Sequence, residues 1–196
     1  MKKALITGMT GMVGSHLADY ILEHTDWDVI GMQRWRSPLD NIMHLMPRIN
    51  AKDRVFVEYG DLNDMSSLLT VLNKVKPDYI FHLAAQSYPQ TSFTAPIDTL
   101  GTNILGTCRL LDAVKQLGLD PVIHVCASSE VFGRVSADKL PIDAGCAVVN
   151  AATCAAVFNI LLSIIPRTAG VGHKQSDQHA GDKGACQQTA EGGGRC

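Results

Sequence analysis

Three glycines near the start of the chain have the spacing of a phosphate-binding turn. Gly8, Gly11 and Gly14 stand three residues apart, directly after an apolar run and directly before a helical pattern. Gly8 permits a tight turn, Gly11 lets backbone amides approach a pyrophosphate, and Gly14 allows close packing of helix on strand. The pattern predicts a dinucleotide site; the alternative is a tight glycine turn without a ligand.

The segment after the second apolar run indicates which dinucleotide binds. In a site for NAD, an acidic residue about 20 positions past the glycines binds the ribose hydroxyls. This sequence has Gln33-Arg34-Trp35-Arg36-Ser37 there, with Arg34 twenty residues after Gly14. A guanidinium attracts a 2′-phosphate and donates two hydrogen bonds to it, and no acidic residue repels the phosphate. We therefore expect NADP as the cofactor; the alternative for Arg34 is a solvated surface arginine.

Five short apolar runs, with helical patterns between most of them, predict the elements that hold these residues. The runs are typical of buried parallel strands: Ala4–Thr7, Val29–Met32, Val55–Tyr59, Tyr79–Ala84 and Val122–Cys126. The helical stripes are Val13, Leu17 and Ile21, then Leu68, Leu72 and Val75, then Leu100, Ile104, Cys108 and Leu111. This alternation predicts right-handed crossovers and an α/β fold with a doubly wound parallel sheet of the Rossmann type.

The pattern changes near Asp143. Residues 1–143 are predicted to form an incomplete dinucleotide-binding domain. Residues 144–196 form an atypical tail, because they hold 8 of the 17 glycines and 4 of the 6 cysteines but no tyrosine. The uncharged stretch Ala144–Pro166 has the length of a membrane span, yet its polar residues and alanines favour a buried or aggregation-prone segment. Beyond Arg167 the composition is typical of disorder.

Composition excludes several classes of partner. Apolar residues make up 46% and charged residues 18% of the chain, and 17 Lys+Arg against 19 Asp+Glu give a net charge of −2. No basic stripe offers a surface to nucleic acid or acidic membranes. The six cysteines include no Cys-x-x-Cys pair, which favours reduced thiols over a zinc site. Glycines interrupt the apolar start of the chain, so we expect no signal peptide. We also expect no bound metal and a cytoplasmic location.

Four further motifs follow the glycine turn in an order that resembles a known superfamily. They are Gly60-Asp61-Leu62, His82-Leu83-Ala84-Ala85-Gln86-Ser87, Asn103-Ile104-Leu105-Gly106-Thr107 and Ser128-Ser129-Glu130-Val131-Phe132-Gly133. With the glycine turn they resemble the extended branch of the short-chain dehydrogenase/reductase superfamily, from Met1 to about Asp143. The resemblance implies these cofactor-binding residues: Gly8, Thr10, Gly11, Met12, Val13, Gly14, Arg34, Asp61, Leu62, Leu83, Ala84 and Ala85.

The same resemblance implies how the cofactor and substrate are arranged. Asp61 and Leu62 would contact the adenine, Ala84 and Ala85 would line the nicotinamide side, and Ser87 would lie near the substrate's sugar. For Asp61 the alternative is a carboxylate that caps the following helix.

The segment Ser128-Ser129-Glu130, together with Arg34, resembles the GDP-mannose 4,6-dehydratase family, with serine in place of threonine at 128. A carboxylate such as Glu130 serves as acid/base for loss of water once C4 of the sugar is oxidised. Ser128 would hydrogen-bond the reacting hydroxyl. The substrate would be a GDP-sugar, and full-length members would form homo-oligomers. The alternatives are another sugar-nucleotide epimerase or dehydratase and, for Glu130, an exposed loop carboxylate.

The family's Tyr-x-x-x-Lys pair has no counterpart in these 196 residues, and no tyrosine follows Glu130. The tyrosine would be the base for the C4 hydroxyl, and the lysine would lower the tyrosine's pKa. Two hypotheses follow. In the first, the chain is the cofactor-binding part of a dehydratase, and its tail is the product of a frameshift or of alternative splicing. In the second, the chain is a non-catalytic nucleotide-binding or interaction module. We expect no dehydratase activity from the chain as written.

Overall fold

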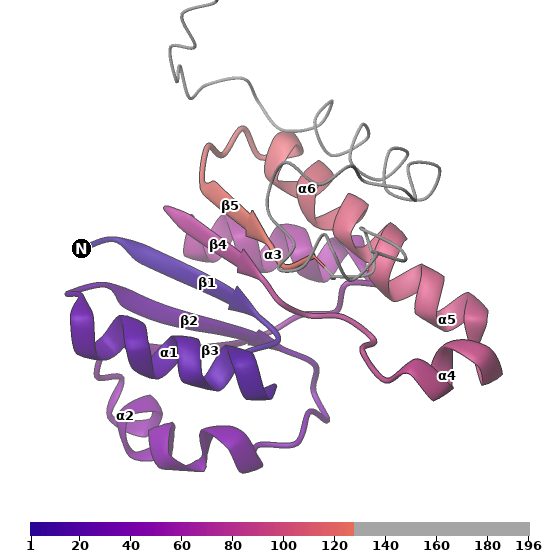
Figure 1. Ribbon diagram of the computed structural model, residues 1–196. Helices are drawn as coiled ribbons and strands as arrows, with labels where there is room; N and C mark the ends of the chain where they lie inside the picture. The colour runs from indigo at the N-terminus through magenta and orange to yellow at the C-terminus, as the bar shows by residue number, and fades with distance from the viewer. Residues whose placement is uncertain (128–196) are drawn as a thin grey trace, which may run out of the picture. The chain divides into compact units, whose positions relative to one another are not determined.

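A five-stranded parallel sheet forms the centre of the computed structural model, which describes residues 1–127 (Figure 1). Its strands are β1 (Lys3–Thr7), β2 (Asp28–Gln33), β3 (Val55–Tyr59), β4 (Tyr79–His82) and β5 (Val122–Val125). They lie in the order β3-β2-β1-β4-β5. The chain therefore builds one half of the sheet outward from β1 and then returns to build the other half from β4. This doubly wound order confirms the fold predicted from the apolar runs.

Helices cover both faces of the sheet (Figure 1). One face carries α1 (Met12–His24), the 3-10 helix η1 (Asp40–Leu45) and α2 (Met46–Ala51). The other carries α3 (Met65–Val75) and α6 (Gly106–Gln116). The segments α4 (Pro89–Thr94), α5 (Pro96–Leu100) and η2 (Gly101–Leu105), the last a π-helical turn, lead into α6.

Strand β1 is buried on both faces, which explains its continuous apolar run. Leu5 belongs to the core beneath α3 and α6, whereas its neighbours Ala4 and Ile6 belong to the core beneath α1. All three are fully buried. A strand at the centre of a parallel sheet needs apolar residues at every position, because helices cover both of its faces.

Two helical stripes predicted from the sequence differ from the buried faces of the helices in the structure. In α1, Val13 is exposed and the buried face instead begins at Gly14 and Ser15. The reason is that α1 approaches the glycine turn through small residues. In the last stripe, Leu100 is exposed while Leu111 is buried. The π-helical turn between them holds an extra residue, which breaks the four-residue spacing.

Candidate functional site

A cleft opens at the carboxyl ends of β1, β2, β3 and β4. Its lining comes from the last residues of β2, from the loops after these four strands and from α5 and η2: Gly8, Thr10, Gly11, Met32, Gln33, Arg34, Ser37, Gly60, Asp61, Leu62, Asn63, Leu83, Ala84, Ala85, Gln86, Ser87, Asp98 and Thr102. Strands β1 and β4 are neighbours in the sheet, and the strand order reverses between them. Open α/β sheets bind their ligands at this kind of switch point.

The glycine turn between β1 and α1 leaves no room for side chains at two of its glycines. Gly8 has a φ of +76°, and a Cβ atom there would lie 3.0 Å from the Ala84 Cα atom. A Cβ atom on Gly14 would lie 2.7 Å from the Met9 Cα atom. Side chains at either position would therefore push the turn away from its neighbours. Gly8 therefore makes the tight turn, and Gly14 lets the start of α1 approach the backbone of that turn.

The first turn of α1 presents uncapped backbone amides. Gly11 is the N-cap residue, no side chain of the described part accepts a hydrogen bond there, and the first turn contains no acidic residue. The first amides of a helix have no intrahelical acceptor, so they carry partial positive charge that suits an anion. The side chains of Met12 and Val13 are exposed and lie outside the cleft lining. These two residues can contribute their backbone, as can Gly14.

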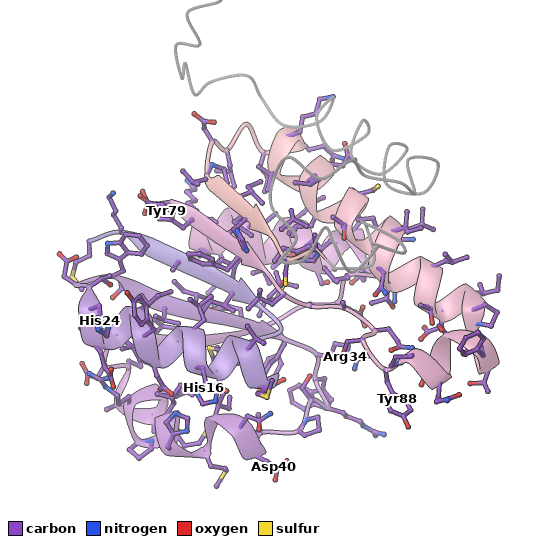
Figure 2. All side chains as sticks on the ribbon, in the orientation of Figure 1. His16, His24, Arg34, Asp40, Tyr79 and Tyr88 are labelled. Carbon is purple, nitrogen blue, oxygen red and sulfur yellow. The ribbon has the colours of Figure 1, made fainter. Side chains whose placement is uncertain are left out.

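The end of β2 places a buried amide beside an exposed guanidinium. Gln33 is the last residue of β2 and is buried, whereas Arg34 is exposed at the cleft (Figure 2). Within residues 1–127 the Arg34 guanidinium has neither an ion-pair nor a hydrogen-bond partner. The Arg34 amide donates to Ser37 Oγ over 3.2 Å, which closes a turn. Arg36 is exposed and does not line the cleft.

The loop after β3 contributes Asp61 and Leu62 to the cleft. The Asp61 carboxylate accepts a hydrogen bond from the Asn63 amide at 2.8 Å. The helix that follows is capped by Asp64, which accepts from the amides of Ser66 and Ser67. The alternative that Asp61 caps this helix is therefore wrong, because Asp64 occupies that position and leaves the Asp61 carboxylate at the cleft.

A buried polar chain fixes the start of the loop after β4. The Thr7 hydroxyl lies 2.8 Å from His82 Nδ1, and its oxygen accepts from the amides of Leu83 and Ala84, each at 3.2 Å. On the other side of the ring, His82 Nε2 lies 3.0 Å from the hydroxyl oxygen of Thr107. Burial lowers the pKa of His82 from 6.5 to about 4, so the ring is neutral at pH 7.

The remainder of this loop is held by Asn103. Its side chain accepts a hydrogen bond from the Gln86 amide at 2.7 Å and donates to the Gln86 carbonyl at 3.0 Å. Leu83, Ala84 and Ala85 line the cleft on this loop together with exposed Ser87. The sequence did not reveal the positioning roles of Thr7, His82, Asn103 and Thr107. The available signal was a polar residue at the end of each of two apolar strands.

Several predicted features lie outside the described residues. Ser128 and Glu130, the two predicted catalytic residues, are among them, as is the uncharged stretch 144–166. Within residues 1–127, no group of three or more His, Cys, Asp or Glu side chains could hold a metal ion. No helix in this same range is both long and apolar enough to cross a membrane.

Solved structures share the fold. The Bordetella bronchiseptica enzyme WbmH, in complex with NAD⁺, superposes with a TM-score of 0.63 at 20% identity, covering 84% of this chain and 53% of that one. A UDP-glucose 4-epimerase from Brucella ovis, in complex with NAD, gives a TM-score of 0.63 at 23% identity, covering 76% and 42%. At these identities the comparison shows the fold alone.

Sequence comparison is more specific. A GDP-mannose 4,6 dehydratase of Drosophila melanogaster is 39% identical over 140 residues, which cover 68% of this chain and 35% of the relative. The human protein of that name is 39% identical over 138 residues, covering 67% and 37%. The matched part therefore spans little more than a third of the length of these curated relatives. Residues 5–144 match the family model "GDP-mannose 4,6 dehydratase". The chain belongs to the GDP-mannose 4,6 dehydratase family.

Proposed function

We propose that residues 1–127 form most of the cofactor-binding part of an NADP-dependent GDP-mannose 4,6-dehydratase. The observation that carries this proposal is one cleft at the switch point of the sheet, lined both by Gly11, where the uncapped amides of α1 begin, and by the Arg34 guanidinium, which has no partner among residues 1–127. Both groups are positive, and they belong to the elements that bind a pyrophosphate and a ribose in dinucleotide sites. The family to which the chain belongs supports the same assignment.

The residues of the cleft and of the first turn of α1 beside it fit the parts of a dinucleotide. The amides of Met12 and Val13 would hold the pyrophosphate, and Arg34 would hold a 2′-phosphate through paired hydrogen bonds. Asp61 and Leu62 would lie against the adenine, and Leu83, Ala84 and Ala85 against the nicotinamide. No acidic side chain stands at the end of β2 to repel a 2′-phosphate. We therefore propose NADP rather than NAD as the cofactor.

The bound cofactor would supply the acceptor and donor of hydride in the family reaction. The chain's own residues would position the reactants and move protons. Ser87, exposed at the cleft, would face the sugar. Ser128 would hydrogen-bond the reacting hydroxyl, and Glu130 would exchange the proton lost and regained during elimination of water from a GDP-sugar.

A second candidate is a nucleotide-binding module without catalysis. The observation in its favour is the absence of a Tyr-x-x-x-Lys pair from the 196 residues. Reading the other two frames of the coding DNA past codon 143 distinguishes the candidates, because a dehydratase fragment predicts the missing pair there. If no frame contains it, the non-catalytic module is favoured.

Equilibrium titration of the 196-residue chain with NADP⁺ and NAD⁺ tests the cofactor proposal. We expect both to bind, NADP⁺ at least tenfold more tightly, because one bidentate phosphate contact contributes about 1.5–3 kcal/mol. Equal affinities would contradict the assignment of Arg34, and absence of binding would contradict the site itself.

A further inference from the structure

One side chain of the cleft carries a buried hydrogen-bonding atom that the described part of the protein does not satisfy. Gln33 is 8% exposed, and its Oε1 atom is buried without a hydrogen-bond partner among residues 1–127. Buried polar atoms in folded proteins are nearly always hydrogen-bonded. Because Gln33 also lines the cleft, a ligand that brings a donor explains the unpaired oxygen.

The backbone around Gln33 indicates which part of a ligand reaches it. The preceding carbonyl, that of Met32, accepts a hydrogen bond from the Gly8 amide at 3.1 Å, at the phosphate end of the cleft. The carbonyl of Gln33 accepts from the Gly60 amide at 3.0 Å, beside the loop proposed to contact the adenine. The end of β2, which carries Gln33, therefore lies between the element for the phosphates and the element for the base. In an adenine dinucleotide the group between them is the adenosine ribose.

A ribose hydroxyl is the donor that fits. The end of β2 is the position from which an acidic residue accepts hydrogen bonds from the ribose in sites for NAD. An amide oxygen accepts the same hydrogen bond without negative charge. It therefore tolerates a 2′-phosphate that a carboxylate would repel, while Arg34 next to it supplies the positive charge.

We propose that Gln33 Oε1 accepts a hydrogen bond from the 3′-hydroxyl of the adenosine ribose, and that Gln33 shares with Arg34 the selection of a 2′-phosphorylated cofactor. Arg34 binds the phosphate, and Gln33 binds the sugar without adding a negative charge that would repel the phosphate. This inference rests on the proposed function, because it requires the cleft to bind a dinucleotide.

Three variants of the 196-residue chain test the inference by equilibrium titration with NADP⁺ and NAD⁺. Gln33→Leu removes the hydrogen-bond acceptor and keeps a side chain of similar size. We expect the affinities for NADP⁺ and for NAD⁺ each to fall by about three- to tenfold, the net effect of one hydrogen bond. Gln33→Glu adds a charge, and we expect the ratio of NADP⁺ to NAD⁺ affinity to fall more than tenfold. Gln90→Glu adds the same charge on the exposed side of α4, outside the cleft lining, and should leave both affinities unchanged.

A ligand change on the unmodified chain tests the same hydrogen bond without a variant. Adenosine 2′,5′-bisphosphate should bind about three- to tenfold more tightly than its 3′-deoxy form. This difference should vanish in Gln33→Leu, whose thermal unfolding without ligand reports whether it folds.

The outcomes separate the two proposals. If the unmodified chain binds NADP⁺ but prefers neither form of the bisphosphate, or if Gln33→Glu leaves the NADP⁺ to NAD⁺ ratio unchanged, the role of Gln33 is wrong and the cofactor site stands. If the unmodified chain binds neither dinucleotide, both proposals are overturned.

Discussion

The Nε2 atom of His82 donates a hydrogen bond to the hydroxyl oxygen of Thr107 over 3.0 Å. The direction follows from the next contact, because the Thr107 hydroxyl donates its only hydrogen to the carbonyl of Asn103 at 2.7 Å. His82 Nδ1 is then the acceptor, and Thr7 donates to it. The ring is therefore held neutral in one tautomer between β1 and α6. Its partner Thr7 accepts hydrogen bonds from the amides of Leu83 and Ala84 at the cleft.

This arrangement predicts that acid destabilises the fold through His82. Its pKa is about 4 in the folded protein and 6.5 as the ordinary value, so between these limits the unfolded chain binds more protons. The contribution of the neutral His82 ring to the free energy of unfolding is fully present above pH 6.5 and is lost as the pH falls towards 4. We expect the free energy of unfolding to drop by about 2 kcal/mol between pH 7 and pH 5 on this account. His82→Gln, which does not titrate, should lose less over this range in denaturant titrations. Equal pH dependence in both chains would contradict the assignment.

Gly14→Ala should destabilise the fold by about 1–3 kcal/mol, because the added methyl group meets backbone atoms of Met9 and Gly8 that cannot rotate away. Gly101→Ala is the matched control, since the nearest atom to a Cβ there, Asn63 Oδ1, is 3.7 Å away and the backbone is helical. The control should be neutral or stabilising. Chemical denaturation measures both variants, and similar losses would show that the turn is not tightly packed.

Arg34→Ala should weaken NADP⁺ binding by about 10–150-fold while changing NAD⁺ binding little, since only NADP⁺ carries the 2′-phosphate. Arg36→Ala removes another exposed charge from the same segment but outside the cleft lining, and should have a small effect. An unchanged NADP⁺ to NAD⁺ ratio in Arg34→Ala would make the cofactor assignment wrong.

The 196-residue chain should not convert GDP-mannose to a 4-keto-6-deoxy product. The elimination proposed for Glu130 would require prior oxidation at C4 of the sugar, and the 196 residues contain no Tyr-x-x-x-Lys pair to assist that oxidation. General-base assistance contributes about 10²–10⁴ in rate. A version continued in the restored frame should be active and should lose dehydration on Glu130→Gln. Detection of 4-keto product from the short chain would mean that another base acts in its place.

The sequence by itself determined the five strands, their parallel α/β arrangement and the family. These features depend on local patterns: continuous apolar runs mark strands buried on both faces, and a glycine turn between strand and helix has a fixed spacing. The assignments of Ser128 and Glu130 rest on such a pattern alone.

Only the tertiary structure decided which residues act together. Thr7 and His82 are 75 residues apart, and they meet because β1 and β4 pair side by side. Burial and hydrogen-bond satisfaction depend on such distant neighbours. For this reason the sequence indicated Arg34 and Asp61, while only the fold showed that the buried Oε1 atom of Gln33 lacks a hydrogen-bond partner among residues 1–127 and that Asp64 is the helix cap.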